Sequence, residues 1–382
     1  MQYNMRMPKA VYSGEDATKN LTGMLAGVKK VTVITDKGIE AAGLTDHALE
    51  CIREAGAEII VIDSIPPEPT YSEVQNVVDS VKKEGSECLI AIGGGSVMDT
   101  TKLASIASTD EFGVKELLDN PLLGRKSVRT ILIPTTAGTG SEATPNAIVA
   151  VPEKELKIGI VNPEMIADEV ILDAQMTKNL PLKIAAATGV DALAHCIECY
   201  TSNKANTFSN LYAMEGMKLI FKNIEAACLD RDALEAKNKM LIAAFYGGAA
   251  ITASGTTAVH ALSYPLGGKY HIAHGVSNAI LLLPVMKFNK DACLPQFAEI
   301  HDALDMGDVT ADPEVKADRV IERMGEIITN LQIPKSLREF NVSPDDLETL
   351  VEAGMQVTRL LNNNRKKVTP EDARRIYQEV LV

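Results

Sequence analysis

Four residues in the second half of the chain have the types and spacing of a metal site. Asp191 and His195 lie in GVDALAH, four positions apart, so a helix would place both side chains on one face. His260 lies in TTAVHAL and His274 in YHIAHGV. Three imidazoles and one carboxylate suit Fe(II) or Zn(II) rather than magnesium or calcium, and a metal with an open position can polarise a carbonyl group. Ordinary buried or surface histidines are the alternative interpretation.

A run of glycines marks a second place for chemistry. The apolar segment CLIAIGGG (88–95) predicts a buried strand, and the spacing in SVMDTTKLASIAS predicts the helix that follows it. Gly93, Gly94 and Gly95 would let the backbone approach a ligand, and the N–H groups that open the helix would suit a pyrophosphate. Asp99 lies in the first helical turn, where a carboxylate favours the helix dipole. Because the motif is not GxGxxG, a tight strand–helix turn without a ligand also explains it.

Hydroxyl groups and a carboxylate follow two further predicted strands. The loop PTTAGTGSEAT (134–144) overlaps the end of the strand predicted at 130–136, and its composition suits contacts to phosphate, ribose or nicotinamide. Asp36 ends the strand predicted at 31–36, where a carboxylate can accept from a ribose 2′-hydroxyl and would repel a 2′-phosphate. These residues predict a cofactor crevice at the carboxyl edge of a sheet and favour NAD(H) over NADP(H). A flexible loop and a plain turn aspartate are the alternatives.

The spacing of apolar residues changes along the chain and predicts two domains. In the first part, short apolar runs alternate with amphipathic segments; they lie at 31–36, 58–63, 88–95 and 130–136. This rhythm predicts a doubly wound, mostly parallel sheet. In the second part, apolar residues recur every three or four positions, at 181–202, 208–229, 231–253, 317–333, 343–361 and 369–381. The fold class is therefore α/β plus all-α, with an α/β domain at 1–175 and a helical domain at 176–382.

Composition and charge narrow the class of protein. Of 382 residues, 46% are hydrophobic and 23% are charged, which is ordinary for a soluble globular protein. A net charge of −13 argues against nucleic acid or an anionic membrane surface as the main partner. The chain starts without the apolar region of a signal peptide, and no run approaches the ~18 apolar residues of a membrane span. Six scattered cysteines are typical of a reduced, cytoplasmic protein.

Taken together, these motifs resemble the iron-dependent (group III) alcohol dehydrogenase family. The resemblance runs nearly end to end and rests on GGGSVMDTTK (93–102), PTTAGTGSEAT (134–144), ATGVDALAHCIE (187–198), HALSYPLGGKYHIAHGVSNAILLLP (260–284) and RLLNNNRKKVTPEDARRIY (359–377). It implies a dinucleotide-binding α/β domain, a helical metal-binding catalytic domain and an active site in the cleft between them. It also implies hydride transfer between NAD(H) and a small alcohol or aldehyde, with one divalent metal, Fe(II) or Zn(II), polarising the substrate oxygen.

The resemblance assigns roles to individual residues. Asp191, His195, His260 and His274 match the family's metal ligands. The matches to cofactor contacts are Gly94, Gly95 and Ser96 in the pyrophosphate loop, Thr135, Thr136, Thr139 and Ser141 in the second loop, Asn146 and Lys157 beside nicotinamide and ribose, and Leu180 at the hinge. Asp36 and Asp99, from the reasoning above, complete the predicted cofactor site.

Proton transfer involves two residues near the fourth candidate ligand. His271, three positions before His274, is the candidate catalytic residue, as a proton relay or substrate contact, although it could equally support a ligand or face solvent. Many family members carry a histidine four residues after the third ligand, where this chain has Tyr264, and a phenol has different proton chemistry. The chain also departs from the family in its tail, NNNR (362–365), where a proline often precedes the arginine.

The resemblance implies small substrates such as ethanol, butanol, propanediols or lactaldehyde. Some members take aldehydes with an anionic tail, such as succinic semialdehyde or sulfoacetaldehyde, and the cations Lys269 and His271 favour that choice weakly. A dehydroquinate-synthase-like lyase, which also uses NAD and a metal, is the alternative enzyme. The few histidines and the apolar run at 249–259 speak against it. A metal or nucleotide sensor without catalysis is a third class.

The start of the chain bears on assembly. Tyr3–Gly14 predicts an edge strand, which could pair with its copy across a two-fold axis. We therefore expect a homodimer or an assembly of dimers.

Overall fold

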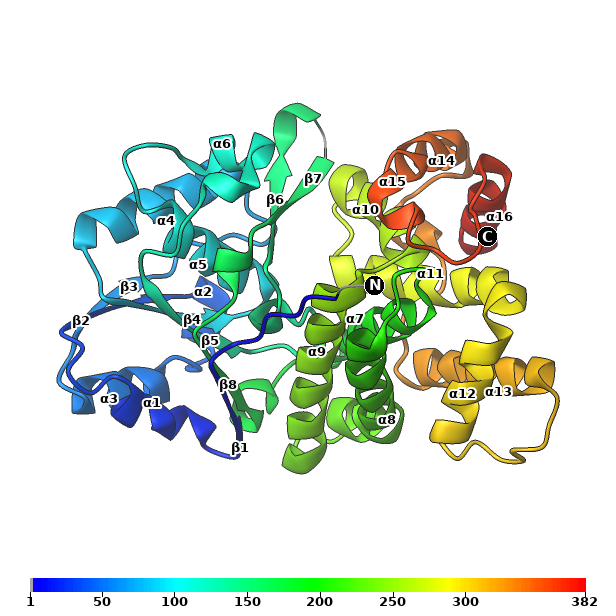
Figure 1. The fold of residues 1–382 in the computed structure, drawn as a ribbon, viewed down its shortest axis with the longest axis horizontal. Helices are drawn as coiled ribbons and strands as arrows, with labels where there is room; N and C mark the ends of the chain where they lie inside the picture. The colour runs from blue at the N-terminus through cyan, green and yellow to red at the C-terminus, as the bar shows by residue number, and fades with distance from the viewer. Residues whose placement is uncertain (1–2, 155) are drawn as a thin grey trace. The chain divides into compact units, whose positions relative to one another are not determined.

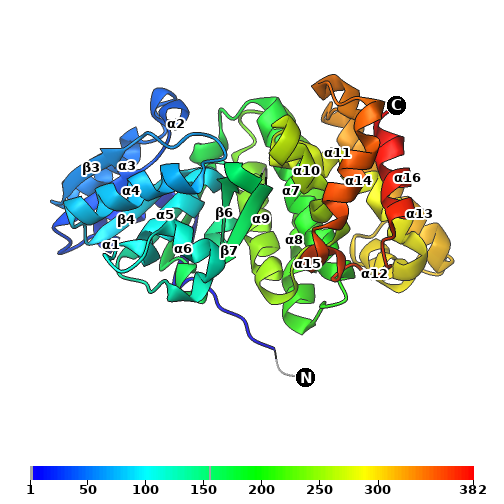
Figure 2. The same ribbon diagram turned by 90° about the horizontal axis from the view of Figure 1, so that it is seen from above.

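The computed structural model describes residues 3–154 and 156–382, which form two compact units. The first unit is Arg6–Leu180, and the second is Pro181–Val382 together with the described residues before Arg6. The first contains a sheet flanked by helices, and the second consists of packed helices (Figures 1 and 2). Nowhere in the described part of the chain does a helix have the length and apolar character needed to cross a membrane.

A parallel sheet organises the first unit. Among the described residues it has six strands in the order β1-β8-β5-β4-β2-β3, and every neighbouring pair is parallel. These strands are β1 (Ala10–Gly14), β2 (Lys30–Ile34), β3 (Glu58–Ile62), β4 (Cys88–Gly93), β5 (Arg129–Pro134) and β8 (Glu169–Asp173). A separate antiparallel hairpin joins β6 (Asn146–Val151) to β7 (Leu156–Val161). The predicted mostly parallel α/β sheet is confirmed.

Helices cover both faces of the sheet. The helices of this unit are α1 (Asn20–Met24), α2 (Lys37–Ala41), α3 (Asp46–Glu54), α4 (Tyr71–Glu84), α5 (Gly95–Ala107) and α6 (Val114–Asp119). Alternate residues of a strand point to opposite faces, and Ile90 and Ile92 of β4 pack in one core cluster with Leu21 of α1 and Ile52 of α3. The helices α4 and α5 lie on the other face (Figure 1). Because both faces are covered, every residue of β4 is buried.

The helix α4 shows how local sequence sets an element's ends. Thr70 accepts a hydrogen bond from the N–H of Glu73, and the carboxylate of Glu73 accepts from the N–H of Thr70, which closes a capping box. The helix ends where Gly85 adopts a left-handed conformation with φ +64°. These two signals fix the segment that connects β3 to β4.

The second unit is helical, as predicted. Its helices are α7 (Leu182–Thr201), α8 (Thr207–Leu229), α9 (Leu234–Ser254), α10 (Ala258–Tyr270), α11 (His274–Asn289), α12 (Leu294–Ala303), α13 (Pro313–Asn330), α14 (Leu347–Met355), α15 (Thr358–Leu361) and α16 (Pro370–Val380). The helix α7 packs against α8, α9 and α11. Its approach to α8 is close, because a Cβ atom on Gly216 would lie 2.5 Å from Cys196 Sγ. A buried, tightly packed α7 is the scaffold for two of the candidate ligands.

Three expectations about individual segments were wrong in part. The stretch 343–361 is not one helix but a short 3-10 turn followed by α14 and α15. The strand predicted at 31–36 is β2, which ends at Ile34 rather than at Asp36, because the Asp36 side chain caps α2. Of Tyr3–Gly14, Ala10–Gly14 alone forms a strand, at the edge of the sheet beside β8. The hairpin of β6 and β7 was not predicted from the pattern of apolar residues.

Candidate metal centre and cofactor site

Three helices bring the candidate ligands together. Asp191 and His195 project from one face of α7, His260 comes from the first turn of α10, and His274 is the first residue of α11. The start of α11 approaches α7 so closely that a Cβ atom on Gly275 would lie 2.9 Å from a backbone oxygen of α7. Glycine after His274 therefore permits the approach that delivers its ring to the cluster.

The four side chains form a compact cluster. One possible ligand atom from each residue lies within 4.8 Å of the others. The Oδ1 atom of Asp191 is 3.8 Å from His195 Nε2, 3.7 Å from His260 Nε2 and 4.0 Å from His274 Nε2. Bonds of about 2.1 Å to a tetrahedral ion place neighbouring ligand atoms roughly 3.5 Å apart, so a small contraction would complete such a shell. The set fits a first-row divalent metal in both donor type and spacing.

Glu198 lies behind His260 and was missed by the sequence reading. Its side chain is fully buried and accepts from Thr257 Oγ1 at 2.6 Å and from the N–H of Val259 at 2.7 Å. Its other oxygen accepts from Nδ1 of His260. Because Nδ1 then carries the proton, Nε2 keeps its lone pair directed into the cluster. The available signal was spacing, since Glu198 follows Asp191 by seven residues and therefore shares its helix face.

Charge inside the cluster favours an ionised carboxylate. Burial alone would raise the pKa of Asp191, but the three surrounding imidazoles outweigh it and hold that pKa below its usual value. Burial would lower the pKa of His260, but the carboxylates of Glu198 and Asp191 reverse the effect and raise it. The side chain of His274 keeps 30% of its exposure, whereas that of Asp191 keeps 1%. The cluster is therefore closed behind Asp191 and accessible beside His274.

A cavity of about 660 Å³ lies at the carboxyl ends of β2, β3 and β4. The segments that follow these strands form its lining, which includes Asp36–Gly38, Asp63–Pro67 and Gly94–Val97. The strand order reverses here, because β3 lies on one side of β2 and β4 on the other. Doubly wound sheets bind ligands at such switch points. The cavity thus unites Asp36 with Gly94, Gly95 and Ser96 from the sequence prediction.

The three glycines of the loop have different reasons to be glycine. A Cβ atom on Gly93 would lie 2.6 Å from the side chain of Val97, so this residue is required for packing of α5 on β4. One on Gly95 would lie 3.0 Å from Thr139, whereas one on Gly94 would meet ordinary contact distances. Gly94 is the N-cap of α5 and has no side chain to accept from the first N–H groups of this helix. These donors are therefore left for a ligand in the cavity that Gly94–Val97 line.

Two buried hydroxyl groups lack a partner in this unit. The Oγ1 atoms of Thr135 and Thr136 are buried and have no hydrogen-bond partner among the described residues. A buried hydroxyl without a partner costs free energy, so it normally faces a bound group or water. Both follow β5 directly, and Thr136 lies against Gly94. These orphaned atoms fit a cofactor with polar edges at this place.

Two family models together match most of the chain. Residues 8–174 match the iron-containing alcohol dehydrogenase model, and residues 185–381 match the C-terminal model of the Fe-containing alcohol dehydrogenase family. The chain belongs to the iron-containing alcohol dehydrogenase family. This family comprises nicotinamide-dependent alcohol oxidoreductases with a divalent metal, so the chain is a metal-dependent alcohol dehydrogenase that uses NAD(H), as the motifs predicted.

Individual relatives agree with this assignment. The chain is 33% identical over 356 residues to long-chain-alcohol dehydrogenase 1 of Geobacillus thermodenitrificans, which covers 92% of this chain and 89% of the relative. The crystal structure of a 1,3-propanediol oxidoreductase is 28% identical, covers 100% of both chains and has a TM-score of 0.93. Sulfoacetaldehyde reductase from Bifidobacterium kashiwanohense in complex with NAD⁺ is 25% identical, with coverage of 100% and 99% and a TM-score of 0.89.

Asp99 and Ser141 of this dehydrogenase bond to each other within the chain. One oxygen of Asp99 accepts from Ser141 Oγ and the other accepts from the N–H of Ile148 at 2.9 Å. The fully buried Lys102 forms an ion pair with Asp99 at 2.9 Å and donates to the backbone oxygen of Ser141. Both oxygens of Asp99 therefore hold the loop 134–144 and β6 against α5. Their role in cofactor binding stays a prediction, and the contacts found are ones that position the loop.

Three other predicted cofactor residues, Thr139, Asn146 and Lys157, lie in the same loop or in the hairpin of β6 and β7. Thr139 Oγ1 accepts from the N–H of Ser141 at 3.3 Å, and the backbone oxygen of Asn146 accepts from Lys102. Lys157 on β7 pairs with Glu68 at 2.5 Å. Leu180 is the last residue of the first unit, and its N–H donates to the Thr177 oxygen.

The residues expected near proton transfer differ in position. Tyr264 lies one turn after His260 on α10, and its ring centroid is 6.1 Å from that of His274. His271 is exposed and ends α10 in a left-handed conformation with φ +54°. Lys269 forms an ion pair with Asp346 at 3.1 Å, so its charge is already matched within the chain. The lysine therefore lends little support to an anionic substrate tail.

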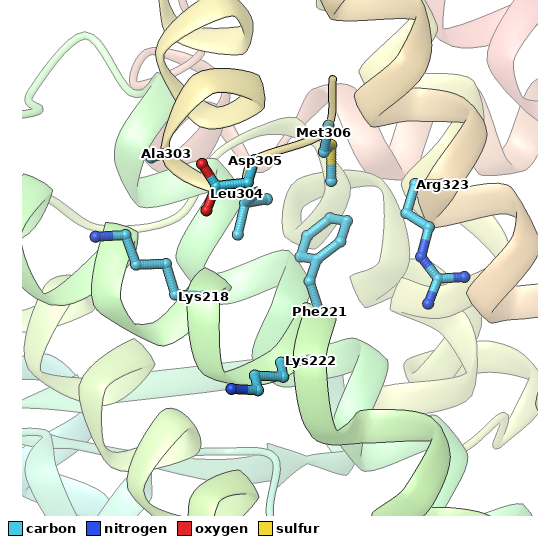
Figure 3. Close-up of a pocket in the computed structure, with 8 residues that line it drawn as sticks. All are labelled: Lys218, Phe221, Lys222, Ala303, Leu304, Asp305, Met306 and Arg323. Carbon is cyan, nitrogen blue, oxygen red and sulfur yellow. The ribbon is translucent and has the colours of Figure 1, made fainter. Parts of the chain in front are cut away.

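The second unit has a further cavity, and none of its lining residues is a candidate ligand or a predicted cofactor contact. It measures about 490 Å³ and is lined by Lys218, Phe221, Lys222, Ala303, Leu304, Asp305, Met306 and Arg323 (Figure 3). Lys218 pairs with Glu215, and Arg323 pairs with Glu225. Most of the positive charge around this cavity is thus matched by neighbouring carboxylates.

Proposed function

We propose that this alcohol dehydrogenase interconverts a small primary alcohol and its aldehyde, with Asp191, His195, His260 and His274 as the ligands of its metal. The convergence of these four side chains, with ligand atoms within 4.8 Å, is the observation that carries the proposal. A divalent ion bound there would supply a Lewis acid for the substrate oxygen. Glu198 orients His260 for this role by accepting its Nδ1 proton.

The cofactor has a proposed place in the first unit. Gly94, Gly95 and Ser96 would hold the pyrophosphate at the start of α5, since the helix leaves N–H donors there. The hydroxyls of Thr135 and Thr136 would bond to the cofactor, which would satisfy both orphaned atoms. We assign cofactor binding to the predicted domain 1–175 and metal and substrate binding to the predicted domain 176–382. Asp99, Thr139, Ser141, Asn146, Lys157 and Leu180 complete the proposed cofactor contacts.

Asp36 supports a preference for NAD(H). Its carboxylate lines the cavity at the end of β2, and Oδ1 accepts from the N–H groups of Gly38 and Ile39. Asp63 lines the same cavity, which adds a second negative charge. A ribose 2′-hydroxyl would be tolerated here, whereas a 2′-phosphate would meet two carboxylates.

The proposed substrate is a short, neutral aldehyde or alcohol. Lys269, which we expected to attract an anionic tail, pairs with Asp346 instead. Because this charge is already matched, neutral substrates are favoured. An anionic aldehyde stays the second arm of the test, because one similar structure is named a sulfoacetaldehyde reductase. His271 is the proposed proton relay, and Tyr264 is the competing residue because its ring lies near His274.

The test is NADH oxidation by metal-reconstituted protein with neutral aldehydes (acetaldehyde, butyraldehyde, lactaldehyde) and anionic ones (succinic semialdehyde, sulfoacetaldehyde). We expect strong turnover of at least one neutral aldehyde. Absence of turnover with every aldehyde, when metal and NADH are shown to be bound, would overturn the proposal. A lyase of the dehydroquinate-synthase type would consume no NADH in net terms, so the same assay separates the two.

Assembly and cell compartment complete the proposal. The edge strand β1 carries backbone groups on its outer side that could pair with a second copy, which supports a homodimer or an assembly of dimers. Light scattering coupled to size-exclusion chromatography would measure the mass. Six scattered cysteines support a cytoplasmic enzyme, and fractionation of the source cells would test this.

A further inference from the structure

Asn278 makes more contacts with the candidate ligands than its position in an apolar helix would require. It lies one turn after His274 on α11 and is fully buried. Its Nδ2 atom is 2.7 Å from Asp191 Oδ1 and 3.1 Å from both His260 Nε2 and His274 Nε2. One amide nitrogen therefore reaches the ligand atoms of three of the four residues.

The other end of the same amide has no partner. The Oδ1 atom of Asn278 is buried and accepts no hydrogen bond from any described residue. An orphaned buried carbonyl destabilises the fold, and an aliphatic side chain of similar size would avoid this cost. Packing alone therefore does not account for an asparagine here, whereas an interaction at the nitrogen end does.

Lone-pair chemistry identifies which contact serves a loaded site. An imidazole Nε2 has one lone pair, so His260 and His274 cannot accept from Asn278 while they bind a metal. A carboxylate oxygen has two, so Asp191 Oδ1 can bind a metal and accept from Asn278 at once. The amide nitrogen itself has no lone pair to offer a metal.

We infer that Asn278 is a positioning residue of the metal centre, which holds Asp191 Oδ1 by an N–H hydrogen bond and so sets the carboxylate's orientation toward the ion. The inference rests on the proposed function only in taking the four residues as metal ligands. The same amide nitrogen lies 3.1 Å from the Nε2 atoms of His260 and His274, so it also links these two rings to Asp191. Supporting hydrogen bonds of this kind typically change metal affinity by about 10–100-fold.

The test measures metal affinity directly, by competition between a chromophoric chelator and the metal-free chain for Co(II) and Zn(II). Asn278→Leu keeps the volume and removes the donor, and Asn278→Ala removes both. We expect both variants to bind metal about 10–100-fold more weakly than the unmodified chain. Ser277→Ala is the matched control, since Ser277 is equally buried on α11 and its hydroxyl donates to the backbone of Ile272. Its affinity should be unchanged.

Two further readouts separate the possible outcomes. NADH binding, followed by fluorescence, shows that the first unit of each variant is intact, and far-UV circular dichroism shows that the helices of the second unit are. The visible bands of bound Co(II) report coordination number, and a positioning residue should leave them unchanged at saturation. Unchanged affinity in both variants would overturn the inference, as would a loss of one ligand from the Co(II) spectrum. If the unmodified chain binds no metal, the proposed function fails instead, so the two failures are distinguishable.

Discussion

Glu198 and His260 come from different helices, yet the carboxylate of Glu198 accepts the Nδ1 proton of His260 and fixes its ring. The same carboxylate accepts from Thr257 and Val259 at the start of α10, so it holds the backbone as well as the ring. The segment that carries one candidate ligand is thereby tied to the helix that carries two others.

Replacing Glu198 by Gln should weaken metal binding by about 10–100-fold, because the charge that stabilises the Nδ1 proton is lost. The amide would also turn a donor toward groups that are themselves donors. Competition with a chelator measures the effect. Glu215→Gln, a change at a half-buried position on α8 that is paired with Lys218, serves as control. Equal affinity in the two variants would refute the role given to Glu198.

Thr135→Val and Thr136→Val should raise KM for NADH by about fivefold each, since one hydrogen bond is worth about 1 kcal/mol. The melting temperature of the cofactor-free protein should not fall, because each hydroxyl lacks a partner there. The control is Thr101→Val, whose buried hydroxyl donates to Val97 O at 2.8 Å. An unchanged KM in both cofactor-loop variants would show that these hydroxyls face no cofactor.

Asp36→Asn should improve the use of NADPH relative to NADH by about tenfold or more, because like charges in contact cost several kcal/mol. Asparagine also caps helices well, so α2 should stay intact. The ratio of kcat/KM for the two cofactors is the measurement. The role of Asp36 in discrimination would be rejected if that ratio did not move.

Asp168→Asn should destabilise the first unit by about 1–3 kcal/mol at neutral pH. Burial would raise the pKa of Asp168, but Lys9, Lys126 and the N–H of Thr130 outweigh it and hold the pKa low. A lowered pKa contributes stability above the unfolded value of about 3.9, and this stability is lost as pH falls through the folded value. Urea unfolding at several pH values should therefore show the two proteins converging below about pH 4. A constant difference would contradict this.

The sequence predicted the parts of the site whose signals are local. The four-residue spacing of Asp191 and His195 put both on one helix face, and the glycines after a buried strand indicated the cavity beside Asp36. Glu198 shares a helix face with Asp191, and Asn278 lies four residues after His274, but neither spacing points to a role by itself. The contacts that reveal a role, from Glu198 to His260 and from Asn278 to Asp191, join different helices. Their functions exist only after tertiary packing.

The contacts of Asp99 could not be predicted from local sequence either. We predicted that Asp99 lies in the first turn of its helix, where a carboxylate favours the helix dipole, but α5 begins at Gly95 and Asp99 is its fifth residue, beyond the first turn. Both of its oxygens bond to residues more than forty positions away, Ser141 and Ile148. The helices α10 and α11 show a second limit. Pro265 and Pro284 are residues that normally end a helix, yet each lies inside its helix in the folded chain.

The most direct test of the account is a titration of metal-free protein with Fe(II) or Zn(II), in which NADH-dependent aldehyde reduction and bound metal are measured together. We predict that activity rises in proportion to occupancy and saturates at one ion per chain. Asp191→Asn and His260→Ala should bind NADH but neither hold the ion nor turn over. Full activity in the metal-free protein, or in either variant without bound metal, would contradict the account.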